Sequence, residues 1–238
     1  MSPNGNEVLA VFARAPALGR VKTRLSPPLS AEQGLALHTA LVEDTLEHLG
    51  RIRRDHLEKF LLLSQPLLDP QDLSVPESWT TAIQAPGDLG KRLAGLFYTS
   101  FRGEARRIVV VGSDSPTLPI EAITEAFEGL VHSKVVLGPA EDGGYYLLGC
   151  SEWIPEIFQH IDWGTETVLE QTTTILKRRD IPYTTLIPWY DIDRAEDLEK
   201  LRQEIAYLKR SDPGLVPLRV AAALPDLDGS EYSLDTDF

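Results

Sequence analysis

Four short segments of this sequence carry side chains suited to binding phosphate groups and a divalent metal. The first, residues 14–24, brings four cations into eleven residues, namely Arg14, Arg20, Lys22 and Arg24. Gly19 lacks a Cβ, so a ligand can approach the backbone closely there. Charge-assisted donors beside backbone N–H groups are what a polyphosphate needs. The spacing is not that of a Walker loop, and a basic surface turn paired with nearby acids is the alternative.

The second segment, Gly112-Ser-Asp-Ser-Pro116, follows the continuous apolar run 107–112. A carboxylate at the end of a buried strand is well placed to hold a hard cation, so Asp114 is a candidate ligand of Mg2+ or Mn2+. An Asx turn or a helix N-cap is the alternative role of this residue. The next predicted helix begins near Pro119, too far away for Asp114 to be its only cap, and this favours the metal.

The third and fourth segments add further carboxylates. Residues 138–146 read Gly-Pro-Ala-Glu-Asp-Gly-Gly-Tyr-Tyr. The two glycines after Asp142 would let a ligand approach the backbone, although Asp-Gly is also a strong signal for a tight hairpin turn. Residues 189–197 contain Asp191 and Asp193, either of which could meet the metal held by Asp114. The alternative is that Asp193 caps the last helix, with Glu196 at capping-box spacing.

Hydrophobic patterning predicts the strands and helices that would position these segments. Short apolar runs predict strands at 8–13, 57–64, 79–84, 107–112, 134–137, 145–149 and 184–187. Helical periodicity predicts helices at 30–49, 91–101, 119–131, 165–179 and 194–209, the first opened by the capping box of Ser30 and Gln33. Strands alternating with helices indicate a single Rossmann-like α/β domain with a mostly parallel central sheet flanked by helices. The close spacing of the strands near 134 and 145 predicts a local antiparallel departure.

The chain divides into a domain over 1–210 and an acidic, weakly ordered tail over 211–238. The tail holds six acidic residues and one basic residue and is rich in Pro, Gly and Ser. The formal net charge of the chain is -13. Such an acidic protein is an unlikely partner of nucleic acid, although cations and a metal can reverse the local sign in one pocket.

The cysteine count and the length of the apolar runs indicate the cellular compartment. Cys150 is the single cysteine, which excludes a disulfide framework within the chain and suits a reducing compartment. No signal peptide is recognisable at the N-terminus, and the apolar runs are too short to span a bilayer. We therefore expect a cytoplasmic protein without a membrane span.

The order and spacing of the motifs resemble those of a bacterial family of GT-A-type glycosyltransferases, some of them linked to arsenosugar biosynthesis. The matching motifs are Ala13-Arg-Ala-Pro-x-x-Gly-x-Val-Lys-Thr-Arg-Leu25, Gly87-Asp-Leu-Gly90, Gly112-Ser-Asp-Ser-Pro116, Gly138-Pro-Ala-Glu-Asp-Gly-Gly-Tyr-Tyr-Leu-Leu-Gly149, Trp163-Gly-Thr165 and Asp191-Ile-Asp193. The wider layout is similar to the nucleotide-diphospho-sugar transferase superfamily, within which 2-phospho-lactate guanylyltransferase carries a similar Lys-Thr-Arg-Leu loop. The resemblance covers residues 7 to about 203.

The resemblance implies a role for each motif. Nucleotide binding would fall to Arg14, Gly19, Lys22, Arg24, Gly87, Asp88 and Gly90, with Lys22 on the phosphates. The metal would be held by Asp114 and by Asp193 or Asp191. The sugar or acceptor would face Asp142, Gly143 and Gly144. From the residues alone, Tyr145 or Tyr146 could line the same ligand, and Trp163 could stack on the base or sugar or serve packing instead. An inverting transfer also needs a base near the acceptor hydroxyl, for which Asp142 is the candidate and Glu141 its rival.

One departure keeps two reactions open. GT-A glycosyltransferases usually carry Asp-x-Asp at the metal-binding strand, whereas this chain has Asp114 alone, followed by Ser115 and Pro116. The first expectation is a metal-dependent transfer of a sugar from a nucleotide sugar to a small-molecule acceptor. The second is a nucleotidyltransferase that uses a nucleoside triphosphate and releases pyrophosphate, and a non-catalytic nucleotide-binding module is the third.

Overall fold

The structure is a computed structural model that describes residues 6–224 of the chain. A seven-stranded sheet forms its centre, in the order β3-β2-β1-β4-β6-β5-β7. The strands are β1 (Glu7–Ala13), β2 (Leu57–Leu63), β3 (Thr80–Ile83), β4 (Arg107–Gly112), β5 (Val135–Pro139), β6 (Tyr145–Cys150) and β7 (Tyr183–Thr185). β6 pairs antiparallel with β4 and β5, while every other neighbouring pair is parallel. The mostly parallel sheet and its local antiparallel departure are therefore confirmed.

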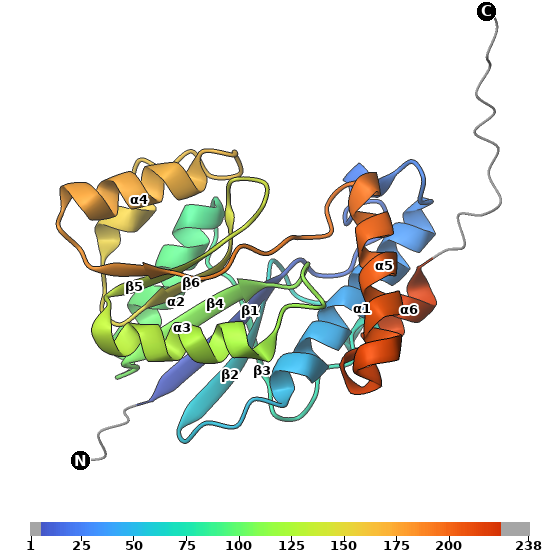
Figure 1. Ribbon diagram of the computed structural model, residues 1–238, viewed down its shortest axis with the longest axis horizontal. Helices are drawn as coiled ribbons and strands as arrows, with labels where there is room; N and C mark the ends of the chain where they lie inside the picture. Colours follow the sequence, from blue (N-terminus) through green and yellow to red (C-terminus); the bar gives the residue numbers. More distant parts are fainter. Residues whose placement is uncertain (1–5, 225–238) are drawn as a thin grey trace, which may run out of the picture.

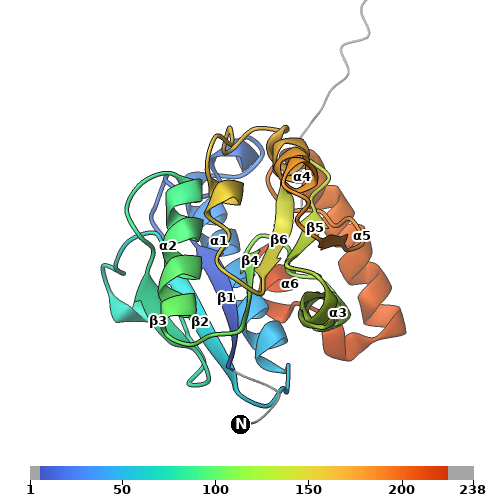
Figure 2. The same cartoon turned by 90° about the vertical axis from the view of Figure 1, so that its left-hand side faces the viewer.

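Helices cover both faces of this sheet (Figures 1 and 2). α1 (Ala31–Gly50) and α3 (Ile120–His132) pack on one face, and α2 (Leu89–Arg102) and α4 (Val168–Arg178) pack on the other. The strands serve both layers, because alternate side chains point to opposite faces. In β4, Val109 and Val111 join the core under α1 and α3, whereas Ile108 and Val110 join the core under α2. This double burial explains the unbroken apolar run of β4.

A third layer lies outside α1. α5 (Ala195–Ser211) and α6 (Leu218–Ala223) pack against it through a separate apolar cluster that includes Leu37, Leu41, Leu201 and Val220. Four short 3-10 helices complete the described elements: η1 (Thr23–Leu25), η2 (Pro70–Asp72), η3 (Pro155–Phe158) and η4 (Pro213–Leu215). The Ser30 capping box is confirmed, since Ser30 Oγ accepts from Gln33 N and Gln33 Oε1 accepts from Ser30 N.

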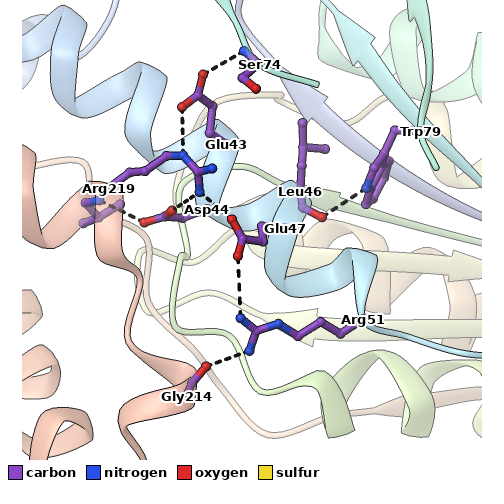
Figure 3. A network of polar contacts seen from close by, with 10 residues as sticks. Glu43, Asp44, Leu46, Glu47, Arg51, Ser74, Trp79, Gly214 and Arg219 are labelled. Carbon is purple, nitrogen blue, oxygen red and sulfur yellow. Dashed lines mark hydrogen bonds and ion pairs between the residues drawn. The ribbon is translucent and has the colours of Figure 1, made fainter. Parts of the chain in front are cut away.

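Part of the predicted tail is folded onto α1. Arg219 forms ion pairs with Glu43, Asp44 and Glu47 (Figure 3). The buried Asp44 also accepts a hydrogen bond from Val220 N at 2.9 Å. Residues 211–224 are therefore ordered, in contrast to the weakly ordered tail expected for 211–238. Apolar side chains and Arg219 hold them against α1. Residues 225–238 lie outside the described part of the chain. Within residues 6–224, no helix is both long and apolar enough to cross a membrane.

Candidate functional site

A pocket of about 600 Å3 opens at the carboxyl ends of β1 and β4. This is the edge of an open α/β sheet at which ligands bind. Its lining from the predicted segments comprises Arg14, Lys22, Arg24, Gly87, Asp88, Asp114, Trp163 and Asp193. Segments that are far apart in the sequence therefore share one pocket.

A second pocket, of about 650 Å3, lies at the opposite end of β1 and β2. Most of its charged groups have partners within the protein: Glu7 is paired with Arg54 and Arg107, and Lys59 Nζ donates to the carbonyls of Gly50 and Ile52. Internal pairing accounts for these charges, so we place the candidate site in the pocket beside Asp114.

Lys22 and Asp114 form the centre of this pocket. Lys22 Nζ lies 2.7 Å from Asp114 Oδ1 and donates to the carbonyl of Ile192 at 2.5 Å. The Lys22 side chain is only 4% exposed. Burial opposes ionisation of Asp114, but the adjacent Lys22 ammonium outweighs it and lowers the pKa of that carboxyl. The floor of the pocket thus holds a charged pair and not a free phosphate-binding lysine.

The loop after β1 is fixed by the backbone conformation of Lys22 and by a contact with His38 of α1. Lys22 itself has a left-handed backbone with φ 49, which few non-glycine residues adopt. The buried His38 on α1 contacts the carbonyl of Arg14 through Nε2 at 3.0 Å. Burial lowers the pKa of His38, so its imidazole is neutral near pH 7. Arg14, Arg20 and Arg24 stay exposed along the pocket wall. Gly19, with φ 69, lies in the same loop but outside the lining.

The two aspartates of the fourth segment face different partners. Ser115 Oγ donates to Asp191 Oδ1. Burial raises the pKa of Asp191 to about 6, and the negative charges of Asp114 and Asp142 contribute to this rise. Asp193 instead accepts from Arg24 at 2.8 Å. The structure therefore brings Asp191 near Asp114 and leaves Asp193 on the wall with Arg24.

The alternative role of Asp193 as a helix cap is wrong. The cap residue of α5 is Arg194. Asp197, in the first turn, accepts from the backbone N–H groups of Asp193 and Arg194 at 2.9 and 2.7 Å. The cap is thus supplied from inside the helix, and the Asp193 side chain is free to pair with Arg24.

The glycine-rich third segment forms the predicted tight turn. Gly143 N donates to Ala140 O at 3.2 Å, and Asp142 Oδ1 accepts from Gly144 N at 2.9 Å. Gly143 has φ 88, and a Cβ there would lie 2.0 Å from the carbonyl oxygen of Glu166. This turn is outside the lining of the pocket. Asp142 still lies close enough to Asp191 to affect its pKa.

Trp163 packs between the start of α2 and Tyr145 of the third segment. A Cβ on Gly90 would lie 2.0 Å from Trp163 Nε1, so the indole rests directly on the start of α2. Tyr145 meets the same ring edge-on, with centroids 6.2 Å apart. Gly90 and Tyr145 therefore support the wall that Trp163 provides and do not line the pocket themselves.

Several lining residues escaped the sequence analysis, among them His38, Ser64, Gln84 and Arg92. One signal could have revealed Arg92. Lys91 and Arg92 stand near the N-terminus of α2, where the helix dipole disfavours cations. A cation at such a position is more easily explained by an anionic or acceptor-rich ligand than by helix stability.

The carboxylates supply only part of a metal site. Among the residues that the structure describes, no group of three or more His, Cys, Asp or Glu side chains could hold a metal ion. Asp114 and Asp191 offer two hard oxygen ligands, although burial and the nearby charges of Asp114 and Asp142 raise the pKa of Asp191. Because Mg2+ typically combines one or two carboxylates with substrate phosphates and water, the donor set fits a metal that arrives with a nucleotide.

Comparison with known proteins shows which families and folds this chain resembles. A family model described as "Uncharacterized protein conserved in bacteria (DUF2064)" matches residues 48–165. A crystal structure described as a "putative nucleotide-diphospho-sugar transferase" from Desulfovibrio desulfuricans G20 is similar, with 28% identity and a TM-score of 0.78 over 92% of this chain and 96% of that chain. A search of curated protein sequences gave no match.

Two more distant structures share the fold. CMP:2-keto-3-deoxy-manno-octonic acid synthetase complexed with CTP matches at 11% identity and a TM-score of 0.52, over 85% of this chain and 99% of that chain. The manganese complex of Rv0371C from Mycobacterium tuberculosis H37Rv matches at 12% identity and a TM-score of 0.50, over 83% and 98%. The expected nucleotide-diphospho-sugar transferase fold is confirmed.

Proposed function

We propose that this chain is a metal-dependent transferase that moves a sugar from a nucleotide sugar to a small-molecule acceptor. The observation that carries the proposal is the meeting of Lys22 and Asp114, 2.7 Å apart, in a pocket walled by Arg14, Arg20 and Arg24. A diphosphate needs cations along its length and a carboxylate-bound metal at one side. The pocket offers the cations and the carboxylate together.

The residues in and around the pocket have distinct roles in this proposal. The exposed arginines hold the phosphates in line with the acceptor. Lys22 keeps Asp114 ionised and fixes its orientation, while Asp191 provides the second carboxylate. Bound Mg2+ or Mn2+ would neutralise the charge that develops on the departing diphosphate. Asp142 would accept the proton of the acceptor hydroxyl, since it lies close enough to Asp191 to affect its pKa.

The structural relatives support a nucleotide and a metal as ligands. The relatives compared above include a complex with CTP and a complex with manganese. The relative at 28% identity carries a nucleotide-sugar description. We extend these ligand classes to the present chain as part of the proposal.

Nucleotidyl transfer is the second candidate, favoured by two observations. The carboxylates near the metal position come from separate segments, Asp114 after β4 and Asp191 after β7, and not from one Asp-x-Asp motif. Asp142, the proposed base, also lies outside the lining of the pocket. A reaction in which a phosphate of the acceptor attacks the nucleotide needs no such base.

Thermal unfolding with ligands tests the site. Nucleoside diphosphates, nucleotide sugars and nucleoside triphosphates are each added with and without Mn2+ to wild type, Asp114→Asn and the control Asp180→Asn, an exposed aspartate outside the pocket. A ligand that binds only the folded chain raises Tm. We expect a Mn2+-dependent rise that Asp114→Asn abolishes and Asp180→Asn retains. Absence of any shift at millimolar ligand would contradict the proposal.

Product analysis separates the two reactions. Hydrolysis or transfer from a nucleotide sugar releases a nucleoside diphosphate, whereas nucleotidyl transfer from a triphosphate releases pyrophosphate. We expect the diphosphate from the nucleotide sugar that gives the largest Tm rise. Release of pyrophosphate from a triphosphate, with no turnover of any nucleotide sugar, would establish the second candidate in place of the first.

A further inference from the structure

Gln84 and Arg92 form a fixed pair at one end of the pocket. Gln84 is 8% exposed, and its Nε2 donates to the carbonyls of Ala13 at 3.1 Å and Leu62 at 2.7 Å. Both amide hydrogens are thereby used, so the orientation of the amide is set. Its Oε1 must face the other way, and it accepts from Arg92 Nη1 at 3.1 Å.

This contact orients the Arg92 guanidinium. Arg92 Nε also donates to the carbonyl of Gly87 at 2.9 Å. An arginine has five N–H donors in one plane, and these two contacts use two of them. Among residues 6–224, the remaining three donors have no acceptor, although Arg92 lines the pocket. The Nε hydrogen and one Nη1 hydrogen are thus engaged, which leaves the Nη2 group and the second Nη1 hydrogen for a ligand in the pocket.

The sheet order indicates which part of a nucleotide would meet this fork. Gln84 follows β3, whereas Asp114 follows β4, and β2 and β1 lie between them. Gln84 Nε2, however, reaches back to the carbonyls of Ala13 at the end of β1 and of Leu62 in β2, so Arg92 lies across β1 from Asp114. A diphosphate held between Asp114 and the arginines of the loop after β1 would direct its ribose and base toward Arg92.

We propose that Arg92, positioned by Gln84, reads the edge of the nucleobase and selects bases that present two adjacent hydrogen-bond acceptors. This inference rests on the proposed function, because it assumes a nucleotide whose phosphates lie beside Lys22 and Asp114. The fork contains donors only. Guanine offers O6 and N7 as an adjacent acceptor pair, and cytosine offers O2 and N3. Adenine places a donor beside its N7, and uracil has a donor at N3 between its two carbonyls.

Calorimetric titration of the full chain with GDP, CDP, UDP and ADP, each with Mn2+, tests the selection. Arg92→Met is compared with wild type and with the control Lys91→Met, which changes the neighbouring exposed cation. Inorganic tripolyphosphate with Mn2+ measures phosphate binding alone. Arg92→Lys is included as a second variant, since it keeps the charge but loses the planar fork.

We expect wild type to bind GDP or CDP more tightly than UDP and ADP. The measured Kd values show which of GDP and CDP is preferred. Arg92→Met and Arg92→Lys should weaken the preferred nucleotide about 10- to 100-fold and leave tripolyphosphate unchanged. Gln84→Met should reduce the base preference while Arg92 is still present. Lys91→Met should match wild type.

The titrations distinguish failure of the proposed function from failure of the Arg92 assignment alone. If wild type binds neither tripolyphosphate nor any nucleotide, the proposed function fails and this inference with it. If nucleotides bind but ADP or UDP is preferred, or if both Arg92 variants keep the wild-type preference, only the assignment of Arg92 fails. Equal weakening of tripolyphosphate and nucleotide would make Arg92 a phosphate ligand and overturn base reading.

Discussion

Lys22, in the loop after β1, reaches across the pocket so that its Nζ lies 2.7 Å from Oδ1 of Asp114 at the end of β4. The two residues are 92 positions apart in the sequence, yet they form the charged floor of the candidate site. The lysine side chain is almost fully buried, while the aspartate side chain is 38% exposed. Such a pair must be kept or removed together, because one charge left alone is costly.

The first prediction concerns this pair. Lys22→Met should lower the free energy of unfolding by about 1–3 kcal/mol, less than for a fully buried pair because Asp114 is partly screened by water. Asp114→Asn should cost less when it is combined with Lys22→Met than when it is made in wild type. Urea unfolding of both single variants and the double variant measures the coupling. Strictly additive effects would show that the ion pair contributes nothing to stability.

The second prediction is a pH dependence at Asp191. Its folded-state pKa of about 6 exceeds the unfolded value of about 3.9, so the folded state binds the extra proton and stability falls as pH rises between these values. Asp191→Asn cannot ionise. Its stability relative to wild type should therefore increase from pH 4 to pH 7 by up to about 3 kcal/mol.

Unfolding of Asp191→Asn and of the control Asp193→Asn by urea at pH 4, 5, 6 and 7 checks this. Asp193 is paired with the exposed Arg24, so its variant should lack the same upward trend. A pH-independent difference between Asp191→Asn and wild type would mean that Asp191 ionises at its ordinary pKa.

The third prediction compares two glycines with similar backbones. Gly143 has φ 88 and Gly164 has φ 83, so alanine suffers comparable backbone strain of about 1 kcal/mol at each. A Cβ at Gly143 would lie 2.0 Å from Glu166 O, whereas a Cβ at Gly164 would meet nothing within 4 Å. Gly143→Ala should therefore lower Tm several degrees more than Gly164→Ala. Equal Tm losses would show that the turn can move away from Glu166 at no cost.

The fourth prediction concerns Glu7, at the end of β1 remote from the site. Its carboxylate is 2% exposed and is bound by Arg54 at 2.6 and 3.1 Å and by Arg107 at 2.8 Å. Glu7→Ala leaves two partly buried guanidinium groups without this partner and should cost about 3–5 kcal/mol. The exposed Glu58→Ala is the control and should change stability by about 0.5 kcal/mol or less. Nucleotide binding by folded Glu7→Ala should equal that of wild type, since Glu7 lies away from the pocket.

Local sequence patterns predicted the strands and helices well where burial is uniform. The run 107–112 became β4 with the same bounds, because a strand between two helical layers must be apolar on both faces. α4 shows the limit of this reasoning. It begins at Val168 and not at Thr165, and Leu169 N donates to Gly143 O. The turn at Gly143 thus accepts a hydrogen bond from the first turn of α4. No local sequence pattern reveals this contact, because the two segments are far apart in the sequence.

The sequence by itself determined which loops carry chemistry, since clustered cations, isolated carboxylates and paired glycines are visible in one dimension. Only the tertiary structure decided how they are combined. It turned Lys22 inward onto Asp114, separated Asp191 from Asp193, and added Gln84 and Arg92 to the pocket. The reason is physical: ion pairing, burial and hydrogen-bond satisfaction depend on which strand ends are neighbours in the sheet, and that order is set by long-range packing of the whole domain.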